Sequence, residues 1–112
     1  MISAKRYKMT QYSVHLSDPA EDDLDEIVQY ISEQLFAPAA ALRLADAFAE
    51  AFVELETLPD KYPLVPDERL AAMGYRKRSV KNYFVFFKIK EITRRVDVAR
   101  ILYARRDWAN IL

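Results

Sequence analysis

Apolar and polar residues alternate near the start of the sequence and then change to a helical spacing. In residues 11–16 every second residue is apolar, which predicts a half-buried strand. Asp18 is the predicted N-cap of a helix, with Pro19 at the first helical position and Glu21 placed as in a variant of the capping box. One apolar stripe extends this helix to about Gln34; its members are Ala20, Leu24, Ile27, Val28, Ile31 and Leu35.

A second helix is predicted to begin at Pro38 and to end before Pro59. Its apolar stripe consists of Ala41, Leu44, Ala45, Phe48, Phe52 and Leu55. Only residues 35–37 separate the two helices, so they should form an antiparallel hairpin. Residues 58–69 contain three prolines and are therefore predicted to be an extended loop.

The remaining sequence predicts three strands joined by short turns, at residues 74–80, 83–90 and 95–103. The middle strand is apolar on both faces and should be central in the sheet. Residues 105–112 are expected to add a short terminal turn that carries Trp108. The predicted fold class is α+β, with the order β-α-α-β-β-β and a helical hairpin packed on an antiparallel sheet. Residues 1–10 are predicted to be an N-terminal extension, with Met9 as an alternative start, and residues 11–112 a single domain.

Composition excludes several kinds of chemistry. The 112 residues are 52% apolar, enough for a core, and include one glycine, one histidine and no cysteine. A single glycine excludes glycine-rich phosphate loops, and the absence of cysteine excludes thiolate metal sites, disulfides and a cysteine nucleophile. We expect no cofactor and no metal. No apolar run is long enough to cross a membrane, and no secretory signal is present, so the expected location is cytoplasmic.

Charge is distributed unevenly along the chain although the total is zero. Residues 1–68 contain 14 acidic and five basic residues, whereas residues 69–112 contain 12 basic and three acidic ones. This asymmetry is compatible with a basic working face, and equally with two halves that neutralise each other across the fold. The neutral total argues against a general, tight nucleic-acid binder. The acidic run at residues 21–26 is explained by helix capping and solvation rather than by a metal site.

Three stretches carry a resemblance to a known family: residues 17–27, residues 74–87 and residues 100–108. Together with the order of elements they resemble the RelE/ParE superfamily of toxins, the plasmid stabilisation family, and are closer to the ParE branch. The resemblance implies a toxin of a type II toxin–antitoxin module that is neutralised by a co-expressed antitoxin. It implies contact with operator DNA only through that antitoxin, and no contact with membranes.

The two branches of the superfamily imply different targets. RelE-type members cut mRNA on the ribosome, and Arg76, Arg78 and Arg106 match basic residues of that nuclease set. Phe84 stands where the nucleases carry another arginine, and no tyrosine or histidine follows Trp108. Proton transfer would then depend on another group, for which the tyrosines at 83 and 103 are candidates. ParE-type members poison DNA gyrase without chemistry of their own, so only the RelE-type reading makes the chain an endoribonuclease.

Six residues are candidates for binding the target: Arg76, Arg78, Lys81, Arg105, Arg106 and Trp108. The first two alternate along one strand and should share a face. Other roles are open for each group. The charges of the strand and its turn could protect a sheet edge from aggregation. Arg105 and Arg106 could form ion pairs with acids of the first helix or with Asp107, and pairs of this exposed kind contribute little stability. Trp108 is more typical of a residue that packs the chain end against the domain than of a target contact.

Overall fold

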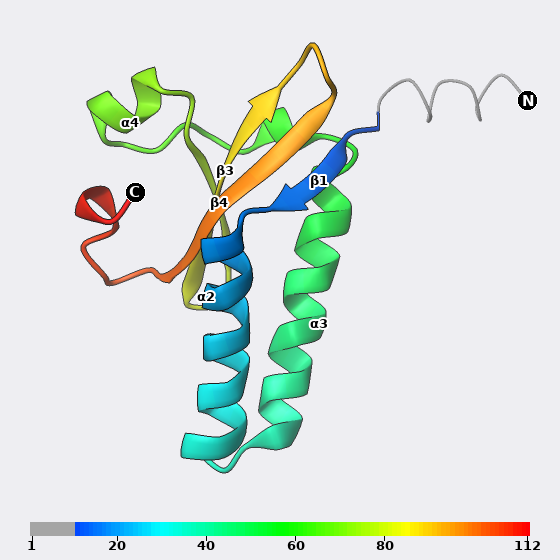
Figure 1. Ribbon diagram of the computed structural model, residues 1–112, viewed down its shortest axis with the longest axis vertical. Coiled ribbons are helices and arrows are strands. Elements are labelled where there is room, and N and C mark those ends of the chain that lie inside the picture. Colours follow the sequence, from blue (N-terminus) through cyan, green and yellow to red (C-terminus); the bar gives the residue numbers. More distant parts are fainter. Residues whose placement is uncertain (1–10) are drawn as a thin grey trace, which may run out of the picture.

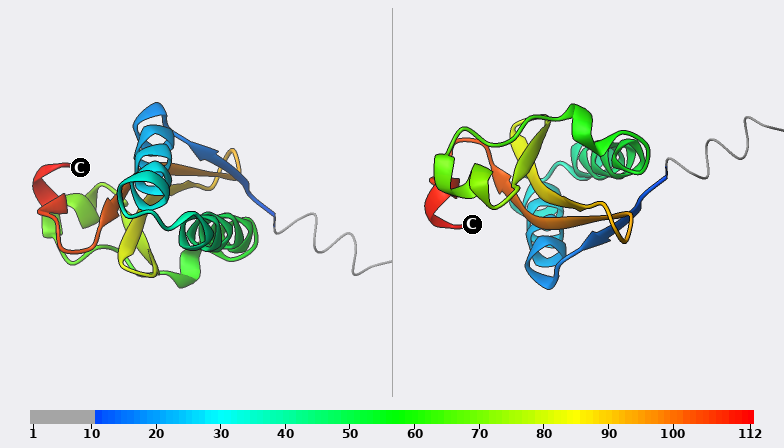
Figure 2. Two further views of the ribbon diagram at one scale, coloured as in Figure 1. Left: turned by 90° about the horizontal axis from the view of Figure 1, so that it is seen from below. Right: turned by 90° about the horizontal axis from the view of Figure 1, so that it is seen from above.

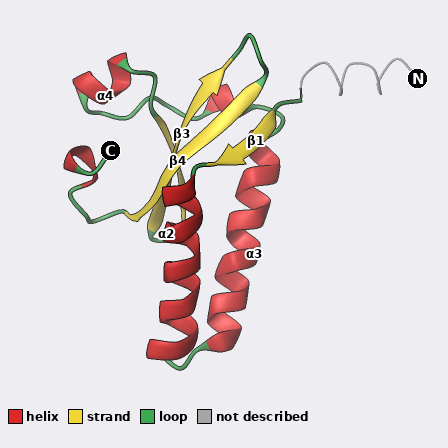
Figure 3. Cartoon of the chain, viewed as in Figure 1, coloured by secondary structure: helices red, strands yellow, loops and turns green. Residues whose placement is uncertain are grey.

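The computed structural model describes residues 11–112, so the predicted extension at residues 1–10 and the alternative start at Met9 lie outside the described residues. The strands are β1 (Ser13–Leu16), β2 (Arg76–Val80), β3 (Tyr83–Lys90) and β4 (Arg95–Tyr103). The α-helices are α2 (Asp18–Gln29), α3 (Pro38–Leu55) and α4 (Glu68–Ala72). A π-helical turn (Tyr30–Gln34) continues α2, and 3-10 turns cover Pro59–Lys61 and Trp108–Asn110 (Figures 1 and 3). The predicted fold class is confirmed.

The four strands form one sheet in the order β1-β4-β3-β2, with β3 in the interior as predicted. The antiparallel arrangement expected for the sheet holds for β2, β3 and β4. It was wrong for β1, which pairs with β4 in parallel. The reason is the intervening chain: the α2–α3 hairpin carries it away from the sheet, so β1 is not tied to its neighbour by a tight turn that would impose the opposite direction.

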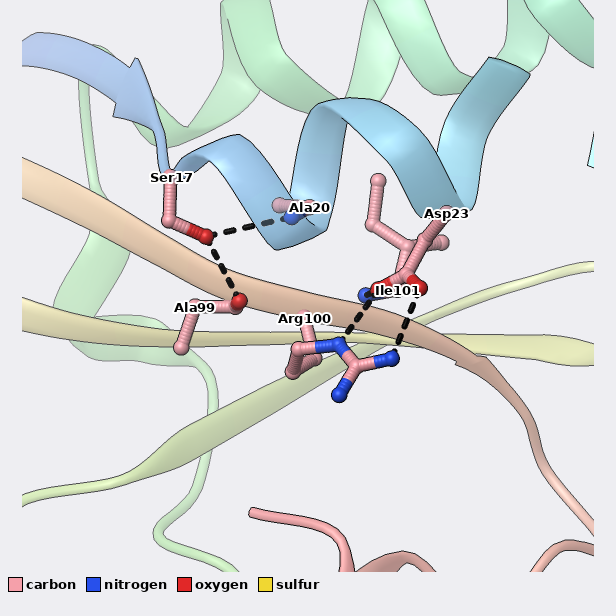
Figure 4. A network of polar contacts seen from close by, with 6 residues as sticks. All are labelled: Ser17, Ala20, Asp23, Ala99, Arg100 and Ile101. Atoms are coloured by element: carbon pink, nitrogen blue, oxygen red, sulfur yellow. Dashed lines mark hydrogen bonds and ion pairs between the residues drawn. The ribbon is translucent and has the colours of Figure 1, made fainter. Parts of the chain in front are cut away.

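Ser17, and not Asp18 as predicted, is the N-cap of α2. Its hydroxyl accepts a hydrogen bond from the backbone N–H of Ala20 at 3.1 Å and donates one to the backbone oxygen of Ala99 at 2.8 Å (Figure 4). A hydroxyl can donate and accept at once, whereas a carboxylate only accepts. Ser17 therefore joins the start of α2 to the neighbouring strand, and Asp18 becomes the first helical residue.

The α2–α3 hairpin packs on one face of the sheet and continues past it, so that its tip stands away from the rest of the molecule (Figure 1). The core of this side is formed by buried residues of both helices and of all three C-terminal strands: Ala20, Leu44, Phe48, Ala51, Leu55, Val80, Val85, Phe87, Val96, Val98 and Ile101. Within residues 11–112, no helix is long and apolar enough to cross a membrane.

The opposite face of the sheet carries a second, smaller core. Phe86 and Leu102 of the sheet pack there against Val65 and Leu70, and the terminal turn closes the cluster. Figure 2 shows α4 and that turn lying together, away from the helical hairpin. The loop predicted for residues 58–69 was wrong in part, because it contains a 3-10 turn and the beginning of α4. Five residues cannot display a helical period, and this helix depends on its tertiary contacts.

An ion pair holds α2 against β4 where β1 has ended. β1 is paired only as far as Val98, and the next part of β4 has an unpaired edge. Both oxygens of Asp23 accept hydrogen bonds from the Arg100 guanidinium, at 2.7 and 2.8 Å, and one of them also accepts from the backbone N–H of Ile101 at 2.9 Å (Figure 4). The bond with Asp23 raises the pKa of Arg100 above its ordinary value. A single carboxylate thus satisfies a strand edge and orients the first helix.

Candidate functional site

Arg76 and Arg78 share one face of β2, as predicted, and that face is turned toward the helices. They lie opposite Phe87 and Val85 of β3, both of which belong to the core beneath the hairpin. Nη1 of Arg76 donates to the backbone oxygens of Tyr62 at 2.6 Å and Asp60 at 3.3 Å. Arg76 therefore fastens the loop after α3 to the edge of the sheet.

Arg78 is held by three different acceptors. Its guanidinium donates to a carboxylate oxygen of Glu54 at 2.7 Å, to the Tyr62 hydroxyl at 3.2 Å and to the backbone oxygen of Ser79 at 2.6 Å. Burial alone would lower the pKa of Arg78, but its bonds with Glu54 and Tyr62 outweigh this and raise it. The hydrogen bond from Tyr62, followed by that from Arg78, lowers the pKa of Glu54. Each of the three guanidinium nitrogens of Arg78 therefore already donates a hydrogen bond within the chain, which leaves fewer N–H groups for a bound target.

Replacing Arg78 with methionine should lower the free energy of unfolding at pH 7 by about 1 kcal/mol, because the charged hydrogen bonds are lost while the pair is partly solvated. The pKa of Glu54 is lower in the folded than in the unfolded chain, so the ion pair stabilises the fold fully at any pH above the pKa that Glu54 has in the unfolded chain. This stabilisation is lost as the pH falls through the pKa that Glu54 has in the folded chain. The difference between wild type and Arg78→Met in urea denaturation should therefore shrink below about pH 4. Lys81→Met is the matched control, and an equal loss there would contradict a specific role of Arg78.

The other candidate residues do not join this pair. Lys81 is exposed in the β2–β3 turn, at a positive φ of 53°. Arg105 and Arg106 are exposed after β4, and among residues 11–112 neither forms an ion pair with an acid of α2. Trp108 lies on the opposite face of the sheet, with its ring 5.2 Å from that of Phe86. The six candidates are therefore divided between two faces and two turns.

The sheet face away from the helices carries basic residues that the sequence did not single out. Lys77 lies 4.1 Å above the ring of Phe84, and Lys88 lies 4.6 Å from that of Tyr75. Beyond them a hollow of about 350 Å³ is lined on its polar side by His15, Lys88, Lys90, Arg95 and Asp97. The alternation of Lys88 and Lys90 along β3 was a signal of period two that could have located this basic sheet face.

Tyr83 lies in a different concavity, between the hairpin and the end of β4. It shares one hollow with Asp23, Arg100, Tyr103 and Arg106. Burial, followed by the neighbouring Tyr103 and Tyr30, raises the pKa of Tyr83 above its ordinary value. Because the pKa is raised, less of the Tyr83 side chain is present as phenolate at neutral pH, and only the phenolate can act as a general base. Within residues 11–112, no group of His, Asp or Glu side chains could hold a metal ion.

The fold of this chain is similar to that of two solved toxin–antitoxin structures. The chain resembles the chromosomal ParDE toxin–antitoxin system of P. aeruginosa with a TM-score of 0.67 and 21% identity, over 86% of this chain and 99% of that one. It resembles the RelBE2 toxin–antitoxin complex of Mycobacterium tuberculosis with a TM-score of 0.61 and 18% identity, over 83% and 98% of the two chains. No curated protein matches the sequence.

The sequence itself assigns the branch. Residues 14–108 match the family described as the ParE toxin of the type II toxin–antitoxin system parDE. The chain belongs to this ParE toxin family, and the resemblance to the RelE/ParE superfamily, closer to the ParE branch, is confirmed.

Proposed function

We propose that this chain is the toxin of a cytoplasmic type II toxin–antitoxin module and that it arrests growth by binding and poisoning DNA gyrase. A co-expressed antitoxin would neutralise it and would supply any contact with operator DNA. The observation that carries the proposal is that Arg76 and Arg78 both donate hydrogen bonds within the protein. A ribonuclease needs its guanidinium groups free to stabilise charge on the scissile phosphate. Here both arginines hold the loop after α3 through backbone and side-chain acceptors.

A second observation supports a mechanism without chemistry. Phe84, at the position where the nucleases carry an arginine, packs edge-on against Phe86 and Trp108, with ring centroids 5.8 and 6.5 Å apart. Aromatic packing therefore fills a position that the nuclease mechanism needs for a cation. Binding of a protein target requires no catalytic group, only complementary surface.

The basic sheet face keeps ribosome-dependent mRNA cleavage as the second candidate. Lys77, Lys88, Lys90 and Arg95 could bind a phosphate backbone without being the nuclease set itself. Of the three arginines that match the nuclease set, Arg106 would then be the one still available for catalysis, because it forms no ion pair within residues 11–112.

The first experiment is DNA supercoiling by gyrase from the source organism, with and without the purified chain. We expect supercoiling to be inhibited and cleaved DNA to accumulate, and we expect a saturating amount of the cognate antitoxin to reverse both effects. Unaffected supercoiling by a folded, antitoxin-free sample would exclude the gyrase proposal. Cleavage of ribosome-bound mRNA by the same sample, lost in Arg106→Ala, would establish the second candidate instead.

A further inference from the structure

The sheet has two outer strands, and the β2 edge is protected against the addition of a further strand. The N–H of Lys77 donates to the backbone oxygen of Pro63 at 3.3 Å. A second bond, of 3.0 Å, joins the N–H of Val65 to the oxygen of Tyr75, so the loop after α3 covers the first part of this edge. β2 also carries three consecutive basic residues, at positions 76–78. Covering loops and exposed charges are usual means by which proteins prevent strand addition.

The β1 edge, at the other margin of the sheet, has neither kind of protection within residues 11–112 (Figure 2). In the parallel pairing with β4, the N–H of Ser13 donates to the backbone oxygen of Arg94 at 2.9 Å. Successive residues of a strand direct their backbone groups to opposite sides, so those of Val14 and Leu16 point away from β4. The strand contains no proline and no Asp, Glu, Lys or Arg.

Two hollows follow the outer side of β1, one on each face of the sheet. On the helix side, the lining of a hollow of about 520 Å³ includes apolar residues and two acids: Val14, Leu16, Leu24, Phe52, Glu21 and Asp25. On the basic sheet face lies the hollow of about 350 Å³ described above. His15 and Leu16 line both hollows, so the β1 edge separates them. A strand added here would place its alternate side chains in the two hollows.

The two hollows differ in charge. The hollow on the basic sheet face is lined by Lys88, Lys90 and Arg95 but by a single acid, Asp97. That acid already pairs with Arg95 at 2.9 Å and with Lys90 at 3.8 Å, so positive charge remains in excess. The helix-side lining has two acids and no Lys or Arg, and neither acid forms an ion pair within residues 11–112. A complementary strand would therefore alternate acidic side chains with apolar or basic ones.

We propose that the β1 edge is the docking site for an extended segment of the antitoxin, which adds to the sheet beside β1. Its acidic side chains point toward the basic sheet face, and its apolar or basic side chains point into the helix-side hollow. Strand addition obtains affinity from main-chain hydrogen bonds and specificity from alternate side chains. The inference rests on one part of the proposed function, neutralisation by an antitoxin, and is independent of the gyrase target.

Other chains fit this edge less well than an antitoxin segment does. A folded target would have to offer an unprotected strand edge of its own, which folded proteins avoid. Pairing of β1 with β1 of a second copy, about a two-fold axis, would place the basic sheet faces of both copies side by side. It would also bring together the acids of the two helix sides. Like charges on neighbouring strands are destabilising, so a second copy is not complementary.

Hydrogen exchange at single amides tests the site directly, with NMR spectra of the isotope-labelled full-length chain. In the free chain, the Val14 and Leu16 amides should exchange at least about tenfold faster than that of His15, whose N–H faces β4. Saturation with the purified cognate antitoxin should slow exchange at Val14 and Leu16 by at least about tenfold, because the added strand supplies an acceptor for each N–H.

Val14→Pro removes one outward N–H and places the proline ring where the added strand lies, while the bonds between β1 and β4 are kept. The Kd for the antitoxin should rise by about tenfold or more. Ser79→Pro removes an outward N–H at the β2 edge instead, and as the matched control it should bind within about twofold of wild type. Should Val14→Pro fail to fold, the exposed Lys90→Glu should also raise the Kd by about tenfold, whereas Lys61→Glu should not.

Each other result overturns a defined part. Antitoxin binding that leaves exchange at Val14 and Leu16 unchanged would exclude the β1 edge but keep neutralisation. Slow exchange of these amides in the free chain would show an edge already covered, by a second copy if it depends on concentration and by the chain itself otherwise. Wild-type antitoxin binding by a folded Val14→Pro, or an equal loss in Ser79→Pro, would also contradict the site. Growth arrest lost in Val14→Pro with antitoxin binding intact would assign the edge to the target. A wild-type chain that binds no antitoxin overturns the proposed neutralisation itself.

Discussion

Replacing Asp23 with alanine should lower the free energy of unfolding by about 3 kcal/mol, because it leaves a partly buried charge and a strand N–H without partners. The carboxylate is only 10% exposed and receives both nitrogens of the Arg100 fork, as well as the backbone N–H of Ile101. No neighbouring strand offers the Ile101 N–H another acceptor, because the pairing of β1 with β4 ends at Leu16. Urea denaturation followed by circular dichroism measures the change.

Three further variants separate the effect of losing the charge from the effect of losing the hydrogen-bond acceptor. Asp23→Asn keeps an acceptor for the Ile101 N–H but loses the charge, so we expect about half of the effect. Asp22→Ala changes the adjacent, exposed acid and should stay within about 0.5 kcal/mol of wild type. Asp23→Ala combined with Arg100→Met removes both charges and should recover part of the loss. An Asp23→Ala chain as stable as Asp22→Ala would show that the pair contributes nothing.

Regular periods in the sequence were enough to predict most of the fold. β3 and β4 have the predicted bounds, because both are rich in aromatic or β-branched residues and short turns define where they meet. The hairpin between α2 and α3 was likewise predicted from two apolar stripes. What could not be predicted depends on contacts distant in sequence. Ser17 becomes the N-cap because Ala99 accepts its hydroxyl hydrogen, and α4 exists because Leu70 packs beneath the second face of the sheet.

The candidate site was less accessible from the sequence, for the same reason. Alternation correctly placed Arg76 and Arg78 on one face, but only the fold shows that both donate hydrogen bonds to Tyr62. Trp108 packs on Phe86, which agrees with a packing anchor for the chain end. Its part in target binding remains a prediction, as do those of Lys81, Arg105 and Arg106.

Phe48→Ala should be among the most destabilising single changes in the chain, with an expected loss of about 4 kcal/mol from lost burial and a residual cavity. Phe48 is fully buried on α3, and its ring lies 5.9 Å from that of Tyr83 and 6.5 Å from that of Phe52. It therefore joins the hairpin to the sheet. Calorimetry or urea denaturation at pH 7 measures the effect, and Phe48→Leu should lose less than half as much.

Leu42→Ala, on the exposed side of the same helix, is the matched control and should change stability by no more than about 0.5 kcal/mol. Because Phe48 holds the hairpin on the sheet, Phe48→Ala should weaken growth arrest and antitoxin binding together, in proportion to the unfolded fraction. A Phe48→Ala chain that keeps wild-type stability would mean that the hairpin is not held on the sheet by this core.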